Sequence, residues 1–181
     1  MVKRFQAQVE EINFKDPVAA KLAAFMKAKR DEIDQVVRRA EELAVGLQTG
    51  SPAFVLCHAD LHPGNLLIAE DSALYIVDWD APLLAPKERD LALVGGCNTW
   101  NDDQRVALFY QGYGPVEVNR AAMAYYRYER VLQDIAAFCE QLLLTDIGGE
   151  DREQSYCYFA SNFLPGQEIE LARQADAELG V

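Results

Sequence analysis

Residues 53–80 differ in hydrophobic pattern from the rest of the chain, and this difference most narrows the folds that the sequence can adopt. Three short apolar runs lie in this segment, at 54–56, 66–68 and 74–77. Runs of three or four residues bounded by polar or turn-forming residues suit strands rather than helices. Because Glu70, Asp71 and Ser72 form a turn signal between the last two runs, we expect a β-hairpin at about 66–77.

The sequence on either side of this segment has the periodicity of helices. Asp16 and Pro17 are typical of a helix cap and a first helical residue, and apolar residues then recur every three or four positions. The pattern predicts further helices over 31–47, 101–111, 118–144, 151–163 and 167–178, and a short helical piece over 91–94 that Asp90 caps. In the longest of these helices, we expect the charged end of Arg130 to reach solvent from an apolar face. The fold class is therefore α+β and mostly α, with one small β element.

We expect one domain over 1–181, because this length and a hydrophobic content of 50% are sufficient for a single core. Its parts are helices over 1–50, the short strands and their loops over 53–80, and a second helical part over 86–181. The sequence contains no internal repeat and no low-complexity tract.

The composition excludes several classes of protein. The chain has 29 acidic residues and 17 lysines and arginines, which gives a net charge of -12. This charge repels nucleic acid and anionic membranes and favours cationic ligands. No apolar stretch reaches the roughly 18–20 residues that span a bilayer, and the N-terminus lacks the core of a signal peptide. The four cysteines lie far apart, which is typical of free, mostly buried thiols. We expect a cytoplasmic protein with no nucleic-acid or membrane partner.

The residues that can carry chemistry gather where the short apolar runs end. Asp60 follows the first run, Asn65 comes five residues later, and Asp78 follows the third run. An Asn and an Asp together suit Mg²⁺, which takes few protein oxygens and completes its octahedron with water and phosphate. A separate carboxylate that is not bound to metal can accept a proton from a hydroxyl group. These residue types therefore favour phosphoryl transfer from a Mg-nucleotide to an alcohol.

The spacing H-x-D-x-x-x-x-N followed by an Asp at a strand end is similar to the catalytic and metal-binding loops of kinases. The specific form "HADLHPGN" at 58–65 with "IVDWD" at 76–80 resembles the aminoglycoside phosphotransferase family, most of whose members carry Gly where Ala59 stands. The segments "APKERDLALV" at 85–94 and "YYRYERVLQDIAAF" at 125–138 resemble more particularly its spectinomycin phosphotransferase branch.

The resemblance implies a C-terminal lobe of a protein-kinase-like fold whose hairpin carries the catalytic and metal loops. It implies that Asp60 is the catalytic base and that Asn65 and Asp78 hold Mg²⁺ for ATP. His58 would support the catalytic loop, and Asp90 would brace it from behind. The implied substrate is a small molecule with a hydroxyl group, such as a cationic aminoglycoside or aminocyclitol, and the implied biological role is antibiotic resistance.

The resemblance also implies a part that these residues do not contain. Enzymes of this type bind ATP with an N-terminal β lobe that has a phosphate-covering loop and a lysine on a strand. The pairs Gly95-Gly96 and Gly148-Gly149 are isolated, and lysines such as Lys21 and Lys27 lie in helical surroundings. We therefore expect the C-terminal lobe alone, from a truncated gene, a split gene or an expressed fragment, with weak activity or none by itself.

Two other functions stay open at this point. An inactive module derived from the same family would use its exposed face to bind a second copy of the chain or a separate N-terminal lobe. Alternatively, His58, Asp60 and His62 alternate in sequence, so on a strand they would share one face and could bind Zn²⁺ in a metallohydrolase. Pro63-Gly64 would interrupt such a strand at once, and the chain has only these two histidines.

Overall fold

A computed structural model of the chain describes residues 1–50, 52–97, 102–146, 148–149 and 151–180. Its helices are α1 (Val2–Glu11), α2 (Pro17–Ala28), α3 (Arg30–Gln48), α4 (Glu88–Leu91), α5 (Asp103–Tyr113), α6 (Arg120–Leu144), α7 (Asp151–Ser161) and α8 (Glu168–Ala177), with short 3₁₀ turns η1 (Pro63–Asn65) and η2 (Glu178–Gly180). Its strands are β1 (Val55–Cys57), β2 (Leu66–Ile68), β3 (Leu74–Ile76) and β4 (Leu83–Ala85).

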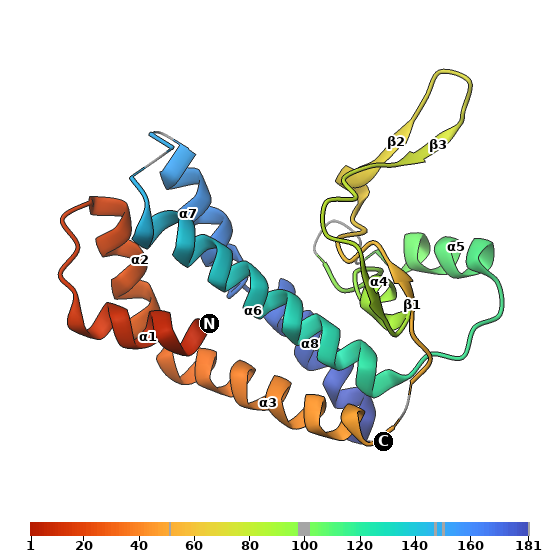
Figure 1. Ribbon diagram of the computed structural model, residues 1–181, viewed down its shortest axis with the longest axis horizontal. Coiled ribbons are helices and arrows are strands. Elements are labelled where there is room, and N and C mark those ends of the chain that lie inside the picture. Colours follow the sequence, from red (N-terminus) through yellow and green to blue (C-terminus); the bar gives the residue numbers. More distant parts are fainter. Residues whose placement is uncertain (51, 98–101, 147, 150, 181) are drawn as a thin grey trace.

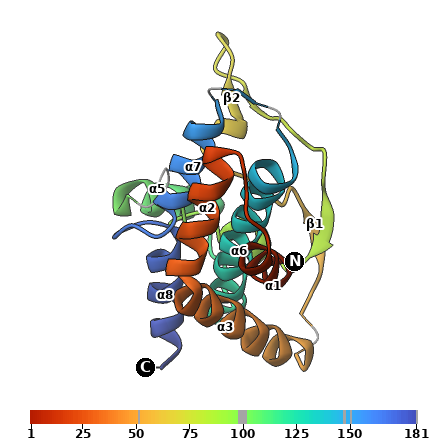
Figure 2. The same cartoon turned by 90° about the vertical axis from the view of Figure 1, so that its left-hand side faces the viewer.

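Helix α6 is the centre of the main helical layer, and Figures 1 and 2 show α1, α2, α3, α7 and α8 around it. The apolar positions of α6 recur every three or four residues, so Val131, Ile135 and Leu142 lie fully buried against the neighbouring helices. The side chains of Phe5, Leu22 and Phe159 fill the core from α1, α2 and α7. This burial, rather than helix propensity, is the main source of stability for helices of this length.

The strands form two separate antiparallel pairs beside this helical layer (Figure 1). The hairpin expected at 66–77 is confirmed, since β2 pairs with β3 and Leu66 lies opposite Ile76. The second pair joins β1 to β4, with Leu56 opposite Leu84, and the sequence pattern did not predict β4. Among the described residues, no strand residue contributes to the main helical core.

The segment 54–84 exposes an unusual amount of apolar surface. More than half of the large hydrophobic side chains that are exposed in the described chain lie in it, including Leu56, Ile68 and Leu84 at 65%, 78% and 67% exposure. The β2–β3 hairpin projects away from the helices (Figure 1), and all but the first of its six strand residues are exposed. Apolar patches of this kind mark surfaces that contact another protein segment or a ligand.

Polar side chains define the ends of several helices. Asp16 caps α2 by accepting a hydrogen bond from the Ala19 N–H at 2.8 Å, Asp102 caps α5, and Asn119 caps α6. The Ala19 N–H and the guanidinium of Arg152 both stabilise the charged form of Asp16, so its pKa is lowered. The helix start expected at Asp16 and Pro17 is therefore confirmed.

Arg152 ties three helices together at one buried point. Its guanidinium donates to the carbonyls of Leu142 and Thr145, at the C-terminal end of α6, at 2.9 and 2.6 Å. It also donates to Asp16 Oδ1 at 2.9 Å, at the N-terminal end of α2. The Arg152 side chain is only 5% exposed, and its bond to the Leu142 carbonyl is buried, so this carbonyl has little access to water as an alternative partner.

Several expectations from the sequence need correction. Helix α1 lies within the part expected to be helical, but the pattern did not give its bounds, and the helix expected over 91–94 lies earlier, at 88–91. Asp90 does not cap that helix, because its carboxylate binds two backbone N–H groups of a distant loop. The expected helix over 101–111 lies over 103–113, and residue 101 is outside the described residues.

Cys57 and Cys139 are buried free thiols, and Cys157 is an exposed one. Within the described residues, the helices include none that is long and apolar enough to cross a bilayer.

Candidate active site

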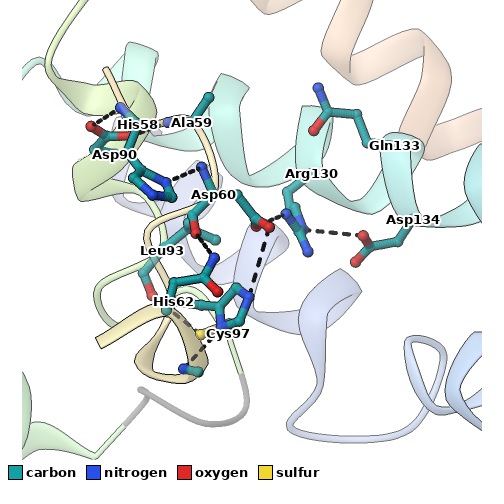
Figure 3. Close-up of polar contacts among 12 residues, drawn as sticks. His58, Ala59, Asp60, His62, Asp90, Leu93, Cys97, Arg130, Gln133 and Asp134 are labelled. Carbon is teal, nitrogen blue, oxygen red and sulfur yellow. Dashed lines mark hydrogen bonds and ion pairs between the residues drawn. The ribbon is translucent and has the colours of Figure 1, made fainter. Parts of the chain in front are cut away.

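The loop at 58–65 is held by the carboxylate of Asp90 in α4. Asp90 accepts hydrogen bonds from the N–H groups of His58 and Ala59, at 2.9 and 2.7 Å (Figure 3). Ala59, whose N–H is the second of these donors, has a left-handed backbone conformation, with φ of 71°. Few residues other than glycine adopt this conformation without strain, so Asp90 and the loop backbone fix each other.

Because of this backbone conformation, the stability of the protein should be sensitive to the side chain at position 59. Replacing the buried Ala59 by Val should lower the free energy of unfolding by about 2–4 kcal/mol, because a β-branched residue at positive φ adds strain to overpacking. Ala59→Gly is the matched control, and it should change stability by less than about 1 kcal/mol because lost methyl burial offsets the relief of strain. Urea unfolding of the three proteins measures both values. Equal stability of Ala59→Val and the parent chain would contradict this account of the loop.

Both ring nitrogens of His58 are used by the backbone. Nε2 donates to the carbonyl of Val77 at 2.8 Å, and Nδ1 accepts from the Asp60 N–H at 3.3 Å. These partners assign the neutral tautomer with its proton on Nε2. His58 is buried, and its ring packs edge-on against Trp79 at 4.6 Å between centroids. The side chain joins the 58–65 loop to the residue that precedes Asp78.

The zinc site considered for His58, Asp60 and His62 is wrong. Neither nitrogen of His58 is available to a metal without breaking a backbone hydrogen bond. His62 Nδ1 accepts from the Gly64 N–H at 3.0 Å, so this nitrogen serves the turn that η1 forms. Within the described parts of the chain, His, Cys, Asp and Glu side chains form no group of three that could hold a metal ion. The loop is a turn rather than a strand, so alternation in sequence does not place these side chains on one face.

Asp60 is partly exposed, and its two carboxylate oxygens have different neighbours (Figure 3). Oδ1 accepts a hydrogen bond from Nη1 of Arg130 on α6. Oδ2 lies 3.7 Å from His62 Nε2, which is beyond hydrogen-bond distance. Arg130 therefore does not extend freely to solvent as the sequence pattern suggested, because it faces the loop.

Arg130 also pairs with Asp134, one turn further along α6, at 3.1 Å from Nε to Oδ1. Burial opposes the charge of Arg130, but the carboxylates of Asp134 and Asp60 outweigh it, so the pKa of Arg130 is raised. Burial raises the pKa of Asp134, although the adjacent guanidinium of Arg130 partly opposes this effect. The sequence contains one local signal for this pair, the i,i+4 spacing of opposite charges on a helix.

Asn65 and Asp78 are brought together by the base of the hairpin. The N–H of Val77 donates to the carbonyl of Asn65 at 3.0 Å, which continues the β2–β3 pairing by one step and places Asp78 next in the chain. Asn65 Nδ2 donates to the carbonyl of Asp60 at 2.9 Å. Asp78 is exposed and has positive φ, at 66°. Hydrogen bonds thus link Asp60 to Asn65 and Asn65 to Val77, the residue that precedes Asp78.

The oxygens of this pair are of the kind that a hard cation binds. The described residues donate no hydrogen bond to Asn65 Oδ1 or to the Asp78 carboxylate, so one neutral and one anionic oxygen remain without a protein donor. Mg²⁺ prefers such oxygens and retains water or phosphate at its other positions. The residues present are compatible with the magnesium site that the sequence predicted.

Some acidic residues that could have lined a pocket for a cationic ligand have structural partners instead. Glu129 lies 3.4 Å from Arg89 Nε and accepts from the Tyr125 hydroxyl at 3.1 Å. Asp102 caps α5, and Asp134 pairs with Arg130. Arg89 is 4% exposed and also donates to Gln133 at 3.1 Å, so α4 is fixed to α6 directly behind the loop.

Comparison with known proteins gives the family and the fold. The model of the phosphotransferase enzyme family matches residues 4–127. A crystal structure of spectinomycin phosphotransferase APH(9)-Ia in complex with ADP and spectinomycin is 36% identical, with a TM-score of 0.83. Its AMP-bound complex is 37% identical, with a TM-score of 0.81. The kinase-like, mostly α fold expected from the sequence is therefore confirmed.

The two similarities differ greatly in how much of each protein they cover. They cover 97% and 94% of this chain but only 54% and 53% of the solved chains. The chain thus spans about half the length of these relatives, which agrees with a single lobe. The family match covers more than half of the residues, and more than a third of the aligned residues are identical to those of an enzyme of known structure. The chain therefore belongs to the phosphotransferase enzyme family.

Proposed function

We propose that the chain supplies the catalytic and metal-binding residues of an ATP-dependent phosphotransferase that acts on a hydroxyl group of a small molecule. The observation that carries this proposal is the set of hydrogen bonds that links Asp60 to Asn65 and Asn65 to Val77, next to Asp78, in a loop that Asp90 and His58 hold. Acceptor activation and nucleotide-metal binding require these residue types close to one another.

In the proposed reaction the acceptor oxygen attacks the γ-phosphorus of ATP. The bond from that phosphorus to the β,γ-bridging oxygen breaks, ADP leaves, and the acceptor proton passes to Asp60. Asn65 and Asp78 would hold Mg²⁺, which when bound would neutralise charge on the phosphates. His58 and Asp90 take no part in the transfer and fix the loop backbone, which matters because positioning supplies much of the rate in phosphoryl transfer.

The proposed acceptor is an aminoglycoside or aminocyclitol, which would make the reaction one of antibiotic resistance. The net charge of -12 favours a cationic acceptor. The related APH(9)-Ia structure contains spectinomycin and ADP, and it is named a spectinomycin phosphotransferase.

The test combines the chain with the missing half of its relative. Residues 1–181 are purified alone and together with the part of APH(9)-Ia that they do not cover, and MgATP-dependent phosphorylation of spectinomycin is measured. We expect no measurable turnover and at best millimolar MgATP affinity from the chain alone, because two oxygens hold Mg²⁺ weakly without bound phosphates. We expect turnover from the mixture. A mixture that associates yet transfers no phosphate would contradict the proposed activity.

A second candidate is a partner-binding module without chemistry, either self-associating or bound to a separate N-terminal lobe. The exposed apolar surface of 54–84 favours it, because this surface belongs to the same segment as the site. Light scattering on the two samples separates the candidates. Association without turnover supports the module, whereas association with turnover supports the enzyme.

A further inference from the structure

The guanidinium of Arg130 lies between two carboxylates that come from different elements (Figure 3). Its Nη1 donates to Asp60 Oδ1 in the loop, 70 residues away in sequence. Its Nε pairs with Asp134 on α6, four residues further along the chain. The side chains of Arg130 and Asp134 are 29% and 24% exposed, so solvent competes only partly for these contacts.

Asp134 determines the direction in which Arg130 points. A residue four positions further along a helix lies over the same face, so Asp134 holds the Nε edge of the guanidinium while the Nη1 end extends towards the loop. A planar fork that is held at one edge presents its other donors in a fixed orientation. The pair therefore forms a rigid donor that is supported by the central helix of the fold.

A purely structural role would be to tether the loop to α6, but the contacts argue against it. The loop path is already fixed by Asp90, which binds two of its N–H groups, and by Asn65 Nδ2, which binds the carbonyl of Asp60. The recorded contact of Arg130 with the loop is to a side-chain oxygen of Asp60 and to no backbone group. What Arg130 fixes is thus the orientation of one carboxylate.

We propose that Arg130, aimed by Asp134, is a positioning residue for Asp60 that occupies Oδ1 and leaves Oδ2 to face the acceptor hydroxyl. This inference rests on the proposed function. It assigns a role in the reaction to two residues of α6 that lie outside the loop motif. Fixing the carboxylate in one orientation matters because a displacement of about 1 Å in a reacting group costs on the order of 10²-fold in rate.

The first test measures kcat and KM in the mixture of the chain with the remaining part of APH(9)-Ia. Arg130→Met should lower kcat by about 10–100-fold with KM for ATP unchanged, because the proposed role of Arg130 is to orient Asp60 and not to bind the nucleotide. Arg130→Lys should recover part of this loss in kcat. The kcat of Asp134→Asn should lie between those of Arg130→Met and Arg130→Lys. A compact ammonium keeps the charge but cannot reach both carboxylates as a fork.

Arg39→Met is the matched control. Arg39 makes a two-pronged pair with Asp176 at 2.7 Å for both contacts, joining α3 to α8 away from the loop. Its loss should lower the midpoint of urea unfolding without changing kcat. If Arg130→Met instead lowers stability and leaves kcat per folded molecule unchanged, Arg130 is only a tether and the inference is wrong.

A double-mutant cycle measures the coupling between Arg130 and Asp60 in kcat, which a purely structural tether would not produce. Once Asp60 is replaced by Asn, removal of Arg130 should have no further effect on kcat, because Arg130 acts through that carboxylate. Independent, additive losses would overturn the inference.

A second measurement uses the chain alone and requires no turnover. Nitrogen-15 NMR of the arginine side chains should show separate, slowly rotating Nη groups for Arg130, which become averaged in Asp60→Ala because this variant has no side-chain acceptor. If the unmodified mixture has no activity, the proposed function fails and this measurement alone decides whether Arg130 holds Asp60. Signals that are unchanged by Asp60→Ala would refute the contact itself.

Discussion

Replacement of Arg152 by Met should lower the free energy of unfolding by about 2–4 kcal/mol, because it removes a buried guanidinium and its charge-assisted hydrogen bonds to two carbonyls and to the partly exposed Asp16. The substitution leaves the carbonyls of Leu142 and Thr145 without their guanidinium donor, and the contact with Leu142 is buried. It also leaves Asp16 without its cation. The expected result is a large decrease in the urea midpoint with an unchanged slope.

Arg173→Met is the control for this prediction. Arg173 pairs with Glu32 at 3.0 Å, but its side chain is 43% exposed, so its loss should cost less than about 1 kcal/mol. Equal effects of the two substitutions would show that burial does not govern the contribution of Arg152.

The loss of stability caused by Arg152→Met should also depend on pH. The pKa of Asp16 is lowered below its ordinary value of 3.8, so its contribution to stability is present above that value and is lost as the pH falls through the lower folded-state pKa. The difference between Arg152→Met and the parent chain should therefore narrow below about pH 4.

Asp60→Asn should lower kcat by about 10²–10⁴-fold in the mixture with the missing half of APH(9)-Ia, the range for loss of a positioned proton acceptor. The Asn side chain has nearly the same shape, and its oxygen can still accept from Arg130, so the loop should keep its structure. Asp60→Ala should be at least as inactive. Phosphate transfer to spectinomycin and urea unfolding are measured on the same samples. An Asp60→Asn protein within tenfold of the parent would exclude Asp60 as the proton acceptor.

The features that could be predicted from the sequence are those that local chemistry determines. Helix α3 is an example, because the buried residues Ile33, Val36 and Leu43 recur at helical spacing. The β2–β3 hairpin was predicted because a turn signal separates two short apolar runs. The candidate residues Asp60, Asn65 and Asp78 were found by their spacing in the sequence, and their roles remain proposals.

The features that were missed depend on residues that are far apart in the chain. Strand β4 has only three residues and is defined by pairing with β1, almost thirty positions earlier. Asp90 has the sequence context of a helix cap, yet its carboxylate is satisfied by His58 and Ala59. Arg130 has the sequence context of a surface side chain, and only the packing of α6 behind the loop places it on Asp60.

The projecting hairpin gives the two sides of the site different mechanical support. Asp60 is connected through Arg130 to α6, whose buried face packs into the main helical core. Asn65 and Asp78 lie instead at the base of an exposed two-stranded ribbon, and such a ribbon has little stability of its own. Local opening at the hairpin therefore requires less free energy than opening at α6. We therefore expect the proposed acceptor side of the site to be stiffer in the isolated chain than the proposed phosphate side, which should gain comparable stiffness when another surface covers the hairpin.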